Sequence, residues 1–104
     1  MTSPQWIKVA NEGDIDDEDA ICVTQEGRKL AIFFVEGTYY ATDNLCTHDV
    51  ANLSEGFVDG ATIECPLHQA VFCLKTGRAL AAPAEKSVRT YPVKVEGGDI
   101  LVQM

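Results

Sequence analysis

The segment CTHDVANLSEGFVDGATIECPLH, residues 46–68, contains the residues that say most about the structure and chemistry of this chain. Both histidines of the protein and two of its four cysteines lie in it. They form two clusters, Cys-x-His and Cys-x-x-His, with residues 49–64 between them. Because thiols and imidazoles are the side chains that bind transition metals, a pair of such clusters indicates a metal centre. The candidate ligands are Cys46, His48, Cys65 and His68.

Two kinds of metal centre fit these four side chains. Zinc binds two sulfurs and two nitrogens in a tetrahedron, but the usual finger places both cysteines in one half and both histidines in the other. Here each half contains one of each. Mixed halves suit a centre with two metal atoms, one held by sulfurs and the other by nitrogens, as in the 2Fe–2S centre in which two His replace two Cys on one iron. A structural zinc domain that serves as an interaction module remains the alternative.

The ligand pattern and the segments around it, YATDNLCTH (40–48) and ECPLHQAVFCLKTGRALAAP (64–83), carry a resemblance to a known family. On these residues the chain resembles the Rieske ferredoxins of bacterial aromatic-ring-hydroxylating dioxygenase systems, of the naphthalene and biphenyl dioxygenase type. The resemblance implies one Rieske 2Fe–2S cluster. Cys46 and Cys65 would bind its inner iron, and a loop with Pro83 would cover the cluster. His48 and His68 would bind the outer iron.

The expected ligands set the charge of the cluster. Two ferric ions, two sulfides and two thiolates sum to zero, so reduction gives a charge of minus one and His ligation raises the potential. High-potential Rieske proteins add a disulfide and hydroxyl donors near the cluster. The matching positions here are the apolar residues Ala51, Leu67, Ala70 and Phe72. We therefore expect a potential near the low end of the Rieske range, about −150 mV.

Composition predicts a single domain over residues 1–104. No apolar run approaches the length of a membrane span, and the N-terminus lacks the basic and apolar regions of a secretion signal. These features favour a reducing cytoplasm. Cys22 and Cys73, which the metal does not use, are interpreted as buried reduced thiols at apolar strand positions, although a disulfide between them stays open.

The chain has 16 acidic and 8 basic residues and a net charge of −8. This charge disfavours binding to nucleic acid or to anionic membrane surfaces, and it suits a partner with a basic docking face. The acidic run at residues 14–19 lacks the spacing of an EF-hand, so we interpret it as a solvated loop.

Short apolar runs bounded by turn residues predict an all-β protein with antiparallel hairpins. Glu26-Gly27 and Glu36-Gly37 are expected hairpin turns, and Pro92 should mark a strand start or an edge strand. The expected architecture is a β-sandwich-like base built from both ends of the chain, with a cluster-binding subdomain of residues 44–83 inserted. The predicted strands span residues 5–10, 20–25, 29–35, 38–42, 62–64, 70–74, 88–95 and 99–103.

By resemblance, the protein is an electron carrier and not an enzyme. It would take electrons from an NADH-dependent flavoprotein ferredoxin reductase and pass them singly to a terminal oxygenase, without binding a small-molecule substrate and as a monomer. A small subunit of a nitrite-reductase-type complex is the alternative within electron transfer. The outer iron should face the partner, and the candidate docking residues are Asp49, Val50, Gln69, Ala70 and Pro83.

Overall fold

Strand β3 (Arg28–Val35) is buried on both of its faces at the centre of the molecule. The computed structural model describes residues 5–44, 51–66, 70–81 and 86–104. Leu30 and Ile32 belong to one hydrophobic core, while Ala31 and Phe33 belong to a second core on the opposite face of the strand. Side chains alternate between the faces of a strand, so a strand between two cores must be apolar at successive positions.

The central sheet has the strand order β2-β3-β4-β9, and every neighbouring pair is antiparallel. Its other strands are β2 (Asp19–Gln25), β4 (Thr38–Asp43) and β9 (Thr90–Tyr91). This order places β9, from late in the chain, against the strand from which residues 45–50 depart.

The two hairpins of the central sheet turn at the Glu-Gly pairs, as the sequence predicts. The backbone φ angles are 52° and 78° at Glu26 and Gly27, and 49° and 80° at Glu36 and Gly37. Two consecutive positive φ angles are the signature of a type I′ turn, whose twist matches that of the flanking strands.

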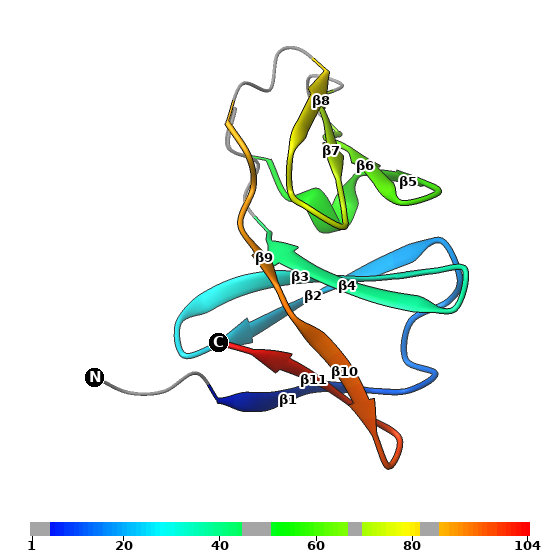
Figure 1. Cartoon of the computed structure of the whole chain (residues 1–104), viewed down its shortest axis with the longest axis vertical. Coiled ribbons are helices and arrows are strands. Elements are labelled where there is room, and N and C mark those ends of the chain that lie inside the picture. The colour runs from blue at the N-terminus through cyan, green and yellow to red at the C-terminus, as the bar shows by residue number, and fades with distance from the viewer. Residues whose placement is uncertain (1–4, 45–50, 67–69, 82–85) are drawn as a thin grey trace.

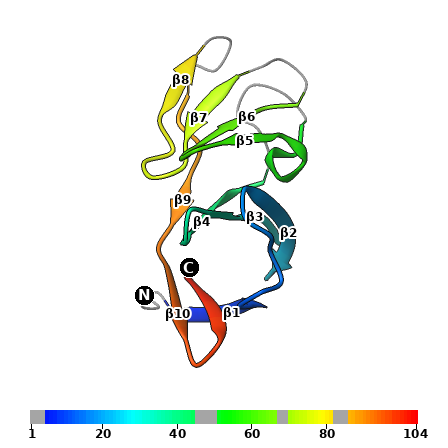
Figure 2. The same cartoon turned by 90° about the vertical axis from the view of Figure 1, so that its right-hand side faces the viewer.

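A second sheet combines the two ends of the chain, as expected. It consists of β1 (Trp6–Asn11), β11 (Asp99–Gln103) and β10 (Val93–Glu96), in the order β1-β11-β10. Ile100 and Val102 of this sheet pack with the lower face of β3. Figures 1 and 2 show the two sheets as the lower layers of the molecule, which confirms the predicted sandwich-like base.

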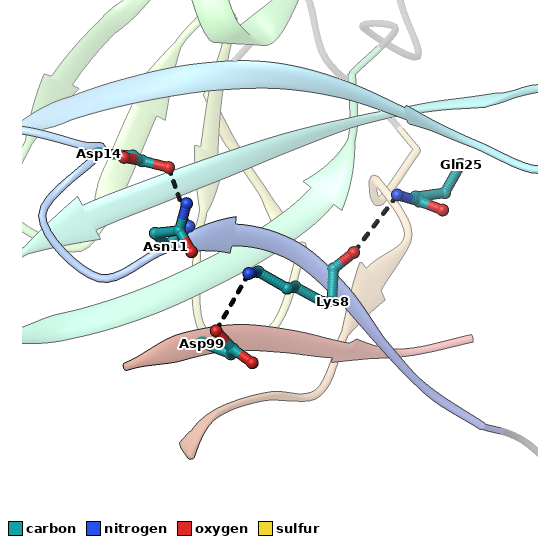
Figure 3. A network of polar contacts seen from close by, with 5 residues as sticks. All are labelled: Lys8, Asn11, Asp14, Gln25 and Asp99. Carbon is teal, nitrogen blue, oxygen red and sulfur yellow. Dashed lines mark hydrogen bonds and ion pairs between the residues drawn. The ribbon is translucent and has the colours of Figure 1, made fainter. Parts of the chain in front are cut away.

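Polar contacts connect β1, an edge strand of the lower sheet, with its surroundings (Figure 3). Lys8 Nζ lies 3.1 Å from Asp99 Oδ1 on the neighbouring strand. Gln25 Nε2 donates to the backbone oxygen of Lys8 at 3.4 Å, which connects the central sheet with the lower one. At the end of β1, the Asn11 N–H donates to Asp14 Oδ2 at 2.8 Å and shapes the start of the acidic loop.

An upper sheet covers the other face of β3 (Figures 1 and 2). It has the antiparallel order β5-β6-β7-β8 and follows a short 3₁₀ helix, η1 (Leu53–Glu55). No strand was predicted over residues 57–59, where the structure has β5. The strands are β5 (Phe57–Asp59), β6 (Thr62–Glu64), β7 (Val71–Cys73) and β8 (Ala79–Ala81).

Pro92 divides the strand that was expected over residues 88–95. Residues 90–91 pair with β4 in the central sheet, whereas residues 93–96 pair with β11 in the lower sheet. Proline has no N–H to donate to a ladder, so a strand can change sheets there. Both segments are edge strands, as predicted for a strand that contains proline.

The expected burial of Cys22 and Cys73 is wrong. Both are free thiols without a disulfide, but Cys22 is exposed and Cys73 is half-buried. Phe72 in β7 and Leu74 just after it face the upper core, so alternation turns Cys73 outward. Cys22 lies on an edge strand of the central sheet.

Nowhere in the described parts of the chain is there a helix with the length and apolar character that crossing a membrane requires.

Candidate metal centre

Cys65 directly follows β6 and is fully buried in the upper core. Its backbone N–H donates to the carbonyl oxygen of Ala70 at 2.7 Å, so the two ends of the segment 66–69 are joined. Pro66 follows Cys65 and fixes one φ angle at the start of that segment. Cys65 is therefore held at the end of β6 by a backbone hydrogen bond to Ala70.

The surroundings of Cys65 fit a sulfur ligand of a metal that is shielded from water. Its core neighbours include Ala51, Leu53, Ala70 and Phe72, all of them apolar. Burying an unpaired charge costs several kcal/mol or more. A thiolate bound to iron shares its charge with the metal, so these apolar surroundings suit a cluster sulfur ligand.

The ends of the first loop also meet. The Leu53 N–H donates to the carbonyl oxygen of Asn44 at 2.7 Å, and the Ser54 N–H donates to Asn44 Oδ1 at 2.9 Å. Asn44 is only 2% exposed. The segment between these residues contains Cys46 and His48 and returns to the upper core at η1, whose Leu53 belongs to the same core as Cys65. The first ligand segment thus returns to the core that contains both ends of the second.

Of the four expected ligands, Cys65 lies within the described residues. Cys46, His48 and His68 lie outside them, as do Leu67, Pro83 and the candidate docking residues Asp49, Val50 and Gln69. Ala70 was expected to contribute to a docking surface, and this is wrong because its side chain is fully buried. Its hydrogen bond to Cys65 and its place in the core explain why a small residue is found there.

Three positions that could carry tuning hydroxyls or a disulfide are apolar and buried. Ala51 is 6% exposed, and Ala70 and Phe72 are both 0% exposed, in the core that contains Cys65. Their side chains cannot donate hydrogen bonds to a reduced cluster, whose extra negative charge such donors would stabilise.

We expect voltammetry to give a potential of about −150 mV. The substitution Ala70→Ser adds a hydroxyl donor, and one net hydrogen bond to the reduced state should raise the potential by roughly 60 mV. A clearly positive potential in the unaltered protein would mean that the reduced cluster is stabilised by hydrogen bonds that these apolar side chains cannot donate.

A polar network stabilises the end of β4, the strand that precedes the first ligand segment. Tyr91 Oη donates to Asp43 Oδ1, and Arg28 Nη1 donates to Tyr91 Oη at 3.2 Å. The Asp43 N–H donates to the carbonyl oxygen of Arg89 at 2.9 Å, and the Arg89 guanidinium lies 5.0 Å from the centre of the Tyr91 ring. These contacts attach the end of β4 to β9.

Burial and the hydrogen bond to Asp43 raise the pKa of Tyr91, and Arg28 opposes the shift. A raised pKa in the folded state means that the folded protein holds the phenol proton more tightly than the unfolded chain. This stability is fully present below the unfolded value of about 10 and is lost as pH rises through the folded pKa. We expect Tyr91→Phe to cost about 1 kcal/mol at neutral pH. Denaturant unfolding between pH 8 and 12 should show that difference shrinking at the alkaline end, and a constant difference would contradict it.

Comparison with known proteins places these features in a family. The family model described as the Rieske [2Fe-2S] domain matches residues 5–92. The ferredoxin component of the naphthalene 1,2-dioxygenase system of Pseudomonas aeruginosa is 49% identical over 100 residues, which cover 96% of each chain. The 3-phenylpropionate/cinnamic acid dioxygenase ferredoxin subunit of Escherichia coli K12 is 54% identical over 76 residues, 72% of each chain.

Solved structures agree with this placement. The Sphingomonas yanoikuyae B1 ferredoxin has a TM-score of 0.91 and 37% identity, covering 96% of this chain and 99% of that one. A chain in a complex of reduced oxygenase and oxidized ferredoxin of carbazole 1,9a-dioxygenase has a TM-score of 0.89 and 35% identity, covering 94% and 92%. A nitrite reductase small subunit from Mycobacterium tuberculosis is also similar, with a TM-score of 0.89 over 99% and 97% of the chains, but at 23% identity it shows the shared fold alone.

Proposed function

Because the chain belongs to the family of Rieske [2Fe-2S] domains, and so carries a Rieske-type cluster, we propose that it is the ferredoxin component of a multicomponent aromatic-ring dioxygenase. It carries one electron at a time to the terminal oxygenase and takes part in aromatic hydrocarbon catabolism. The observation that carries this function is the near full-length identity of 49% to a naphthalene dioxygenase ferredoxin.

We assign the ligands from the spacing of the sequence and from the position of Cys65. Cys46 and Cys65 bind the inner iron, and the imidazoles of His48 and His68 bind the outer iron. The burial of Cys65 supports an inner, water-shielded iron. The cluster supplies a one-electron redox step, and the chain's own residues hold it, exclude water from its sulfur side and set its potential. We assign the cluster-binding subdomain to residues 44–83 of a single domain.

The family match favours the cluster over a zinc site. It leaves the nitrite-reductase subunit as a weaker alternative, because that likeness is limited to the fold. Neither alternative explains the identity shared with dioxygenase ferredoxins over nearly the whole chain. The protein is therefore a component of an enzyme system and does not itself catalyse a reaction.

Two partners follow from this role. A flavoprotein reductase that oxidises NADH supplies the electrons, and a terminal oxygenase receives them, as the carbazole dioxygenase complex suggests by its composition. We place the carrier in the cytoplasm as a soluble monomer that binds no nucleic acid, membrane or small substrate. Its docking interfaces should be small and transient, below about 1,200 Å², because each partner must be released after every electron.

The functional test is reconstitution with a candidate reductase and oxygenase, followed as NADH-driven hydroxylation of an aromatic ring. A lack of hydroxylation with every dioxygenase pair would count against the function.

With a net charge of −8, the carrier should meet basic docking faces faster at low salt. We expect the second-order rate of electron transfer to fall roughly tenfold or more between 20 mM and 500 mM salt. A rate that does not change with salt would mean that charge does not steer the docking of the carrier.

A further inference from the structure

A buried asparagine lies at the base of the first ligand loop, two residues before Cys46. We propose that Asn44 is a positioning residue that clamps this loop and thereby retains the cluster, a role that rests on the proposed ligand set. Asn44 is one of two buried polar residues among those described, and it is 2% exposed. A buried amide is unfavourable unless its hydrogen-bonding groups are paired, so its partners indicate what it does.

Every polar group of the Asn44 side chain is paired. Nδ2 donates to Asn52 Oδ1 at 3.2 Å and to Cys22 Sγ at 3.3 Å. Oδ1 accepts from the Ser54 N–H at 2.9 Å. Two of these three partners lie just beyond the far end of the loop, and the third is on β2. The side chain therefore connects the outgoing strand, the returning chain and the central sheet.

The backbone of Asn44 repeats the same connection. Its N–H donates to the carbonyl oxygen of Lys29 on β3 at 3.0 Å, and its carbonyl accepts from the Leu53 N–H at 2.7 Å. The network continues outward, because Asn52 Nδ2 donates to Glu55 Oε2 at 3.1 Å. An apolar residue of the same size would fill this space, but it could not accept from Ser54 or donate to Asn52. The amide thus fixes the distance between the two ends of the loop.

A fixed base limits the conformations available to the residues between its ends, including two of the proposed ligands. Loop closure that is already made by protein contacts does not have to be made by the metal, so the bound cluster is lost more slowly. Deleting the Asn44 side chain should therefore weaken iron retention beyond its effect on the fold.

Thr42 provides a matched control on the same strand. It is the other buried polar residue, at 0% exposed, and its hydroxyl donates only to the neighbouring Asp43 carbonyl at 2.8 Å. The substitution Thr42→Val removes a buried hydrogen bond on the same strand and leaves every hydrogen bond of Asn44 in place. Its iron-release rate shows the effect of losing a buried polar group whose role is only structural.

The experiment measures iron release from the reduced holoprotein to a ferrous chelator, together with its paramagnetic resonance spectrum. Asn44→Ala should release iron roughly tenfold faster than the unaltered protein, with a broadened cluster signal, whereas Thr42→Val should stay within roughly twofold and keep the signal. Asn52→Ala, at an exposed position, should release iron roughly threefold faster, and the double variant should fall short of the product of the two effects.

Equal release rates for Asn44→Ala and Thr42→Val would overturn the proposal, as would release from Asn44→Ala at the unaltered rate. If Asn44→Ala cannot be purified with its cluster, Asn52→Ala tests the same contact. Faster iron release than from the unaltered protein would support the proposal, and an unchanged release rate would overturn it. An unaltered protein without any cluster would instead overturn the proposed function.

Discussion

Replacing Cys65 with alanine should yield a colourless protein that holds no iron and no acid-labile sulfide. Cys65 is the proposed inner-iron ligand whose position the structure describes, at the end of β6 in the upper core. An iron with one of its two sulfur ligands removed has no described side chain to replace it, because the core around Cys65 is otherwise apolar. Iron and sulfide analysis of the purified protein should fall from two of each per chain to nearly none.

Cys73 is the matched control for this result. It lies on the adjacent strand of the same sheet, but it faces outward and is half-buried. Cys73→Ala should keep its full iron and sulfide content. Cys65→Ser, which preserves the volume of the side chain, should lose the cluster while its far-ultraviolet spectrum keeps the β-sheet signal. Retention of the cluster in Cys65→Ser and Cys65→Ala would show that the ligand assignment is wrong.

Gly77→Ala should be the most destabilising single methyl addition in the upper sheet. Gly77 has a φ of +78°, and a Cβ built there would lie 2.0 Å from the carbonyl oxygen of Val88 and 2.9 Å from Thr90 Cγ2. The close approach is maintained by the Val88 N–H, which donates to the Gly77 carbonyl at 2.8 Å. This contact joins the β7–β8 turn to the chain that leads into β9, so a methyl group would force the upper sheet away from the base.

Gly27 separates the two causes of that effect. Its φ is also +78°, but nothing lies within 4 Å of an added Cβ. Gly27→Ala should therefore cost about 1–2 kcal/mol for the left-handed backbone alone. Gly77→Ala should cost roughly 2–5 kcal/mol, because the steric overlap adds to the same backbone term. Denaturant unfolding of the two variants measures the difference, and equal losses would mean that the contact with Val88 does not constrain the fold.

Most of the architecture could be predicted from local sequence patterns. The Glu-Gly pairs at 26–27 and 36–37 predict hairpin turns because they separate strand-like runs and their glycines adopt a positive φ without strain. The apolar run at residues 29–35 predicts a strand, which β3 confirms, but its position between two cores is seen only in the structure. The ligand pattern predicts the Rieske cluster, and the family match bears this out.

Other features depend on tertiary contacts that no local pattern encodes. Residues 57–59 form a strand only because β6 pairs with them, and three residues are too few to show an alternation. Cys22 and Cys73 are apolar in type, so composition suggested burial, but which face of a strand is covered depends on the neighbouring sheet. Asn44 gave no signal beyond its place before a ligand, because its partners Cys22 and Ser54 are 22 and 10 residues away.

Two cysteines and two histidines are proposed to share one 2Fe–2S cluster. The chain has 2 histidines, so ¹⁵N-labelled histidine marks only the proposed outer-iron ligands. Electron–nuclear double resonance on the reduced, labelled protein should show two ¹⁵N nuclei coupled to the cluster spin. A cluster signal without coupling to labelled nitrogen, as expected for four thiolate ligands, would contradict the claim.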